Sequence, residues 1–298
     1  MIFARPRYFT AMNLSLLLCL AGLFSTSPEN QALALDPQFK RHYEIGEDYL
    51  QREDFKQAIT EFDEAIKIDG GRSKECAKAY RGRGTAYSDL KQYDLALKDL
   101  DRAIALDARN DLSFNNRGAV YLRTLRPLEA IKDFNQALIL NPGNKYAAVN
   151  RAGAYLLTNT PKAGAQATIE WLSKGGWRSD FAGHAAVLSL LAEMSAKDKV
   201  AQAKLLQESR SKLDRLKWPY SLIKHWQGKA TEEDVLEEAQ DSTYNLAQAQ
   251  CFLGLASFYG GDKDDCLRRM EFVQKHGTVN SVEYWLAKGF IQKIKTKK

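Results

Sequence analysis

A short pattern of glycine, tyrosine and alanine recurs along the first half of the chain, and it restricts the possible folds more than any other feature. Gly46, Gly84 and Gly118 follow one another at nearly equal intervals, and a tyrosine follows each glycine three positions later. Each tyrosine is followed at constant spacing by alanine, then phenylalanine or leucine, then alanine again. A fixed period of this length indicates an array of stacked structural units.

The spacing within each unit predicts two helices. Intervals of three and four positions place the glycine and the tyrosine on one face of a first helix, and the later residues on one face of a second. This G-x-x-Y and A-x-x-x-F-x-x-A pattern resembles the tetratricopeptide repeat (TPR). The resemblance implies an all-α fold, a right-handed superhelical solenoid of antiparallel helix hairpins. The predicted array covers residues 35–160, with units at 39–72, 77–110 and 111–144 and a partial fourth unit from 145.

The second part of the chain, residues 161–298, is predicted to be helical but divergent. Pro161 interrupts the pattern, and we expect the regular solenoid to end there. A degenerate repeat is expected at 247–280, followed by a capping helix at 282–293 whose lysines suit a solvent-facing end of a solenoid. All five tryptophans lie in this part, where they are expected to fill the core or, alternatively, to form a binding surface or dimer seam.

The order of segments in this part resembles a narrower family. Residues 218–229, which begin with Trp218-Pro219, are followed by a short acidic helix, by residues 251–254 and by residues 282–284. This order is similar to that of the bacterial envelope TPR family typified by new lipoprotein I. The resemblance implies a dimeric outer-membrane lipoprotein that scaffolds peptidoglycan hydrolases and a protease. A homodimer is therefore one expectation for this chain.

A signal peptide is predicted at residues 1–34. Arg5 and Arg7 precede an apolar run at positions 14–24, and Ala32-Leu33-Ala34 offers a cleavage site. We expect export to a bacterial periplasm, and the alternative is an uncleaved membrane anchor formed by residues 13–25. Cys19 follows three leucines and has no small residue before it, so lipidation is not expected.

The first helices of stacked hairpins are expected to line a concave groove, and the residues beside the glycine face would meet a partner protein. The predicted groove contains Lys40, Tyr43, Glu47, Lys78, Arg81, Thr85, Asp89, Leu112, Asn115, Ala119, Arg123, Tyr146 and Val149. A chaperone-type TPR clamp holds a peptide carboxylate with Lys and Asn one turn apart on the first helix. This chain has Tyr43 and Glu47 instead, so such a clamp is not expected.

No catalytic or cofactor motif is found. The four histidines are far apart, and the sequence lacks HExxH, GxSxG, GxGxxG and P-loop patterns. Outside the leader, Cys76, Cys251 and Cys266 show no CxxC spacing; buried thiols are expected, with a Cys251–Cys266 disulfide as the alternative. We therefore expect no metal, no small-molecule cofactor and no enzymatic activity. An enzyme would have to form its site within residues 161–245.

The net charge of +6 is spread along the chain and does not indicate nucleic-acid binding. The leading hypothesis is a non-catalytic protein–protein interaction scaffold of the cell envelope. The alternative is a self-associating structural protein of the envelope or one that binds the cell wall.

Overall fold

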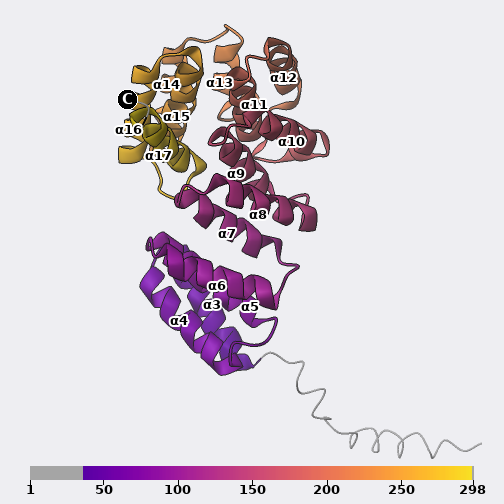
Figure 1. Cartoon of the computed structure of the whole chain (residues 1–298), viewed down its shortest axis with the longest axis vertical. Helices are drawn as coiled ribbons and strands as arrows, with labels where there is room; N and C mark the ends of the chain where they lie inside the picture. Colours follow the sequence, from indigo (N-terminus) through magenta and orange to yellow (C-terminus); the bar gives the residue numbers. More distant parts are fainter. Residues whose placement is uncertain (1–35, 297–298) are drawn as a thin grey trace, which may run out of the picture.

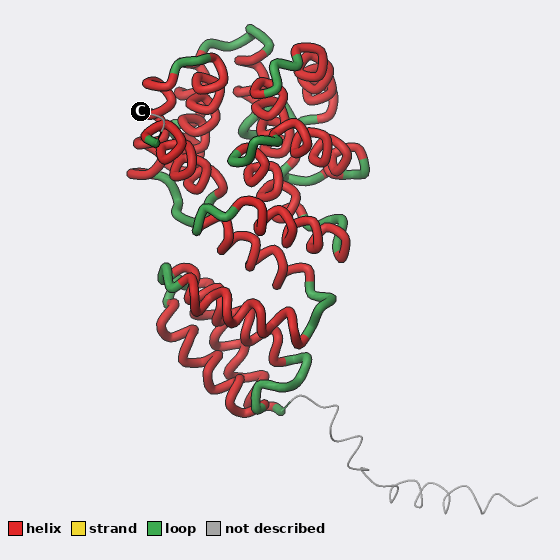
Figure 2. Tube along the Cα trace, in the orientation of Figure 1, coloured by secondary structure: helices red, strands yellow, loops and turns green. Residues whose placement is uncertain are grey.

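The computed structural model describes residues 36–296, and all regular secondary structure within this range is helical. Helices α3 to α17 and one short 3₁₀ helix follow one another along it (Figure 1, Figure 2). The predicted all-α TPR solenoid is confirmed. The predicted signal peptide and Cys19 lie outside the described residues.

The first four units are antiparallel helix hairpins. Their helices are α3 (Pro37–Gln51) with α4 (Phe55–Asp69), α5 (Cys76–Asp89) with α6 (Tyr93–Leu106), α7 (Asp111–Arg123) with α8 (Pro127–Leu140), and α9 (Lys145–Leu156) with α10 (Pro161–Ser173). Asn110 and Asn144 cap α7 and α9, since each side chain accepts a hydrogen bond from a backbone N–H of the first turn. Pro161 begins α10 and does not interrupt a helix, because a proline in the first turn has no intrahelical hydrogen bond to lose.

The recurring residues pack the two helices of each hairpin together. A Cβ atom on Gly46 would lie 2.7 Å from the ring of Phe62, and one on Gly118 would lie 2.7 Å from the ring of Phe134. Both rings are fully buried. Glycine is required at these positions because the aromatic side chain occupies the volume that a methyl group would fill.

The C-terminal half contains α11 (Ala182–Ser195), α12 (Lys199–Lys212), α13 (Tyr220–Trp226), α14 (Glu232–Ala239), α15 (Thr243–Gly260), α16 (Lys263–His276) and α17 (Val282–Lys295). A capping box between Thr231 and Asp234 starts α14, and it satisfies backbone groups that would otherwise be unpaired. Gly261, in the left-handed conformation, ends α15, and the hairpin of α15 and α16 lies close to the degenerate repeat expected at 247–280.

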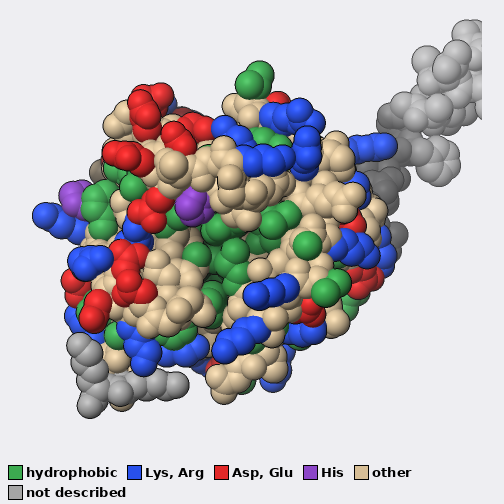
Figure 3. Space-filling model, turned by 90° about the horizontal axis from the view of Figure 1, so that it is seen from above, with side chains coloured by type: hydrophobic (Ala, Val, Ile, Leu, Met, Phe, Trp, Pro, Cys, Tyr) green, Lys and Arg blue, Asp and Glu red, His purple; other side chains and the backbone are tan. Residues whose placement is uncertain are grey.

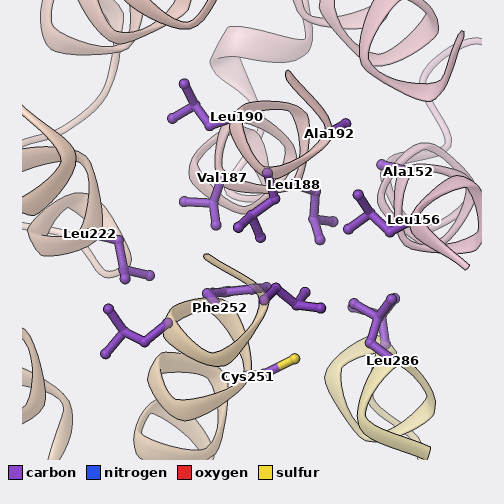
Figure 4. Close-up of a cluster of buried hydrophobic side chains, with 14 of the residues drawn as sticks. Ala152, Leu156, Val187, Leu188, Leu190, Ala192, Leu222, Cys251, Phe252 and Leu286 are labelled. Carbon is purple, nitrogen blue, oxygen red and sulfur yellow. The ribbon is translucent and has the colours of Figure 1, made fainter. Parts of the chain in front are cut away.

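Three helices of this half close on one another together with α9 of the fourth unit. Helix α9 packs against α11, α11 against α15, α15 against α17, and α17 returns to α9. Ala152, Leu188, Phe252 and Leu286 represent these four helices in one shared core (Figure 4). Viewed from above the C-terminal half, hydrophobic side chains gather near the middle and charged side chains near the rim (Figure 3). The circuit of contacts from α9 through α11 and α15 to α17 and back makes these four helices a closed bundle and not an open continuation of the groove.

Helix α17 is the last helix and exposes Lys288 and Lys295 as expected, but its other face does more than cap the end of a solenoid. Val282 and Leu286 belong to the shared core, and a Cβ atom on Gly153 of α9 would lie 2.3 Å from Val282 Cγ2. Gly289 of α17 lies equally close to Leu157, since an added Cβ would be 2.5 Å from its Cδ2. The lysines indicated a solvated helix, but the opposite face of the same helix is apolar enough to seal the bundle.

The thiols and the tryptophans also belong to the interior. Cys76, Cys251 and Cys266 are free and buried, so the alternative of a Cys251–Cys266 disulfide is wrong. Trp285 is buried, and the other tryptophans pack against the shared core while partly exposed. Between residues 36 and 296, no helix is both long and apolar enough to span a bilayer.

Candidate functional site

The first helices of the first three units, α3, α5 and α7, lie next to one another and present the start of the predicted groove. Tyr43 on α3 stacks on Phe39, with ring centroids 6.4 Å apart, and contacts the Phe62 ring at 6.0 Å. Burial raises the pKa of Tyr43, and the nearby negative charge of Glu47 raises it further. Tyr43 is thus a fixed, neutral aromatic residue at one end of the groove.

Each of these helices contributes at least one buried polar atom without a hydrogen-bond partner, and three of these atoms lie beside the predicted groove. They are Glu47 Oε1 on α3, Arg81 Nε on α5 and Asn115 Oδ1 on α7, and none has a partner within residues 36–296. A buried polar group left unpaired costs about 1–3 kcal/mol, so a ligand that supplies the missing partners would recover part of that free energy. Together with exposed Lys40, Lys78 and Leu112 and half-buried Tyr43, these residues define what we call the open face.

Other predicted groove residues connect the first helices to each other. Thr85 on α5 accepts a hydrogen bond of 3.0 Å from the Asn116 side chain on α7. Arg123 Nη1 donates to Asp89 Oδ1 at 2.7 Å, and it also donates to Ser88 Oγ at 2.6 Å. The side chains of Asp89 and Arg123 are only 10% and 9% exposed, so this ion pair is well shielded from water. Thr85, Asp89 and Arg123 therefore hold α5 against α7 and are not free to bind a ligand.

Helix α17 closes the groove at the third unit. The Trp285 ring lies 5.6 Å from the Arg123 guanidinium carbon, and Lys288 Nζ donates to the Arg123 carbonyl oxygen at 3.0 Å. Val149 is 4% exposed and belongs to the shared core, so the prediction that it lines the groove is wrong. Its apolar side chain is covered by the closing bundle.

Tyr146 is exposed but lies apart from the open face. Its ring packs against Phe181, which precedes α11, at 5.1 Å, and Lys145 Nζ lies over both rings. The structure thus divides the predicted groove into an open part on α3, α5 and α7 and a part used for internal packing.

Two arginines whose role was not predicted from the sequence form ion pairs that connect the helices of the hairpins. Arg83 donates through Nε and Nη2 to both carboxylate oxygens of Asp99, at 2.7 Å each, and also pairs with Asp63 of the preceding unit. Arg117 repeats the arrangement with Asp133, at 2.8 and 2.7 Å, and with Asp101 at 2.7 Å. The signal in the sequence was an arginine directly before Gly84 and Gly118, with an aspartate at the same distance after each arginine.

A separate polar network is enclosed in the C-terminal bundle. Gln248 on α15 donates to Glu283 Oε1 on α17 at 3.0 Å, and its own Oε1 accepts from Trp218 Nε1 at 2.7 Å. His184 on α11 lies 3.0 Å from the same amide oxygen. Burial raises the pKa of Glu283, which favours the neutral acid. The network joins three helices of the bundle.

Comparison with known proteins agrees with this geometry. The described fold is an α-helical repeat solenoid, and the tetratricopeptide repeat family matches residues 77–110, which include α6 and all of α5 except its first residue. A tetratricopeptide repeat protein from Parabacteroides merdae is similar over 86% of this chain and 100% of its own, with 14% identity and a TM-score of 0.54. The chain thus contains tetratricopeptide repeats and has the solenoid fold that they build.

Two further similarities each cover less than half of this chain. Human sperm-associated antigen 1 is 30% identical over 97 residues, which are 33% of this chain and 10% of that protein. The match therefore spans about a tenth of the relative's length. The second TPR domain of human RPAP3, solved in complex with an HSP70 peptide, is 28% identical over 39% of this chain and 94% of the domain, with a TM-score of 0.36. The resemblance to the new lipoprotein I family stays a prediction.

Proposed function

We propose that this protein is a non-catalytic scaffold that binds a segment of a partner protein on its open face. The observation that carries the proposal is that each successive first helix has an unpaired polar atom on this face: Glu47 Oε1, Arg81 Nε and Asn115 Oδ1. TPR proteins mediate protein–protein interactions, and this chain contains the repeat. The open face is the part of the predicted groove that the C-terminal bundle leaves accessible.

The chemistry of the open face suits an extended segment. The oxygens of Glu47 and Asn115 accept hydrogen bonds and the nitrogen of Arg81 donates one, so the unpaired atoms alternate between acceptor and donor. An extended backbone offers both N–H and C=O groups and is able to pair with each of them. Leu112, which is 43% exposed, and Tyr43 would contact apolar side chains of the segment.

The proposed ligand is an internal segment and not a chain end. The Lys and Asn residues by which a chaperone-type clamp holds a terminal carboxylate are replaced by Tyr43 and Glu47 in this chain. The negative charge of Glu47 disfavours a terminal carboxylate at that end of the face. This part of the proposal separates the present chain from chaperone co-factors that use the same fold.

We further propose that the protein acts in the bacterial periplasm as an unlipidated adaptor. The support is the leader at residues 1–34, with its apolar run and its Ala-Leu-Ala site, and the absence of a small residue before Cys19. The resemblance of the C-terminal half to the new lipoprotein I family suggests cell-wall hydrolases and proteases as clients. Self-association through the tryptophans remains the alternative; Trp171, Trp218 and Trp285 donate their N–H groups within the chain.

The test is affinity capture from separated periplasmic and cytosolic fractions, followed by measurement of Kd for each captured partner. We expect capture from the periplasm, and we expect the double variant Lys78→Glu, Arg81→Glu to bind at least about tenfold more weakly, since it reverses charge beside the ligand. The control is Lys98→Glu, which makes the same lysine-to-glutamate charge reversal at one exposed position on the second helix α6.

The control should bind within about twofold of the unchanged protein. Wild-type affinity of the double variant for every captured partner would remove the open face as the binding surface. Partners found only in the cytosolic fraction would contradict the proposed location.

A further inference from the structure

Arg151 occupies the same position in the fourth unit as Arg83 and Arg117 in the second and third, because the three arginines are evenly spaced at the repeat period. The carboxylates that pair with the first two are absent around the third. One repeat further along the chain, Asn135 stands at the position of Asp101, and Ala167 stands at the position of Asp133. The fourth unit thus keeps the cation of the pattern and lacks both anions.

The contacts of Arg151 reflect this loss. Its Nη1 donates to Asn135 Oδ1 at 2.9 Å and its Nη2 to the Ala167 carbonyl oxygen at 3.1 Å. Its Nε, which in Arg83 and Arg117 binds an aspartate, is buried without a partner in the described part of the chain. Burial lowers the pKa of Arg151, whereas the pKa values of the two paired arginines are raised.

The charge of Glu170 compensates that of Arg151 only in part. Glu170 on α10 faces the same region, but its carboxylate binds Lys174 Nζ at 2.6 Å, and its side chain is 64% exposed. The guanidinium therefore meets neutral hydrogen-bond acceptors only. A desolvated cation gains most from an anion that also fills the vacant donor position.

A pocket of about 440 Å³ opens beside Arg151, between α8, α9 and α10. Its apolar wall includes Leu138, Trp171 and Ile139, and Ile139 is 73% exposed. The Trp171 ring is held in place because its Nε1 donates to the Pro142 carbonyl oxygen at 3.0 Å. Glu170 and Lys174, which bind each other, complete the lining. The pocket thus combines a half-buried guanidinium that has no anionic hydrogen-bond partner among residues 36–296 with a firm apolar surface, a combination typical of ligand sites.

We propose that this pocket binds an acidic side chain, Asp or Glu, of a partner protein segment that also places an apolar residue against Ile139 and Trp171. The carboxylate takes the place that Asp99 and Asp133 occupy beside the two preceding arginines, and it accepts the Nε hydrogen bond. This site uses α8, α9 and α10 and lies apart from the open face on α3, α5 and α7. It therefore stands independently of the proposed function.

The test is an NMR titration of the purified ¹⁵N-labelled protein that follows the arginine Nε–Hε resonances. The probe is N-acetyl-Leu-Glu-amide, and the control ligand is the uncharged N-acetyl-Leu-Gln-amide. We expect the Arg151 resonance to shift in a saturable manner with the acidic probe only. The Arg83 and Arg117 resonances should stay in place, because their Nε groups are already bonded to aspartates.

Two variants supply the missing carboxylate from within the chain. Ala167→Asp restores the acid that corresponds to Asp133, and Asn135→Asp restores the one that corresponds to Asp101. Each should weaken binding of the acidic probe by about tenfold or more, since the internal carboxylate competes for Arg151. The second variant keeps the test available if the first fails to fold.

Several results would overturn the proposal. One is an Arg151 resonance that does not move with the acidic probe, or moves equally with the uncharged one. Another is a shift of the same size at Arg83 and Arg117, which would indicate general ionic effects. Unchanged affinity in a folded Ala167→Asp or Asn135→Asp variant would also contradict a carboxylate site at Arg151.

Discussion

At the scale of single residues, the close contact between a glycine and an aromatic ring holds each hairpin together. Gly118 on α7 has no room for a side chain, since a Cβ atom there would lie 2.7 Å from Phe134 Cε1. The ring is fully buried and packs among Ala130 and Ala137 on the second helix. A buried ring in a well-packed core is unable to move without opening a void elsewhere.

Gly118→Ala should therefore destabilise the protein by about 1–3 kcal/mol, which is the usual effect of overpacking a core. The control is Gly260→Ala at the exposed end of α15, where an added Cβ would have no neighbour within 4 Å. The control should be neutral or more stable by up to about 1 kcal/mol, because alanine favours a helix over glycine. Urea unfolding gives both values; equal stability of Gly118→Ala and the unchanged protein would refute the packing account.

The sequence predicted this packing because the residues involved are close along the chain and recur at a fixed spacing. It did not predict the arginine–aspartate pairs, although the same spacing reveals them once Arg83 and Arg117 are aligned. The burial of Val149 could not be predicted from the sequence of its own unit. The residue belongs to a shared core to which α11, α15 and α17 contribute, and the residues of these helices lie far away in the sequence.

At the scale of helices, α17 has a role in core packing that its lysine-rich composition did not indicate. Trp285 and Phe290 lie on a buried face, while Lys295 on the solvent side pairs with Glu271 of α16. Local periodicity showed that a helix forms here and that one face is charged. It did not show that the other face packs against α9, because that contact arises only when the bundle closes.

The buried network that ties α17 to α11 and α15 should make stability depend on pH through Glu283. Burial raises the pKa of this carboxyl above its ordinary value near 4.5, despite the opposing influence of His184. The stabilising contribution of a group with a raised pKa is complete below its unfolded-state pKa. That contribution is lost as the pH rises through the folded-state pKa.

Glu283→Gln should have about the stability of the unchanged protein near pH 4 and should be the more stable of the two at pH 7. Between these limits the difference should grow by as much as about 1.4 kcal/mol per pH unit, the value for one proton. The measurement is urea unfolding at several pH values, with Glu237→Gln at an exposed position of α14 as the control. A difference that is the same at pH 4 and pH 7 would show that Glu283 does not titrate as described.

At the scale of the whole molecule, the chain combines two modes of helix packing, a stacked row and a closed bundle. The first three units stack in a row and leave the open face uncovered, whereas α9, α11, α15 and α17 close around a shared core. The contact of Trp285 and Lys288 with Arg123 marks the boundary between them. A ligand on the open face would therefore be blocked by α17 at the third unit and could not extend further along the solenoid.

The central claim, that a partner lies on the open face, is tested most directly by photo-crosslinking in intact cells. The third unit offers a matched pair of exposed leucines: Leu112 on first helix α7, 43% exposed, and Leu128 on second helix α8, 64% exposed. A photoreactive amino acid replaces each in turn, and crosslinked partners are identified by mass spectrometry. We expect a discrete partner to be crosslinked from position 112 and not from position 128. Crosslinking from position 128 alone, or equally from both, would contradict the central claim.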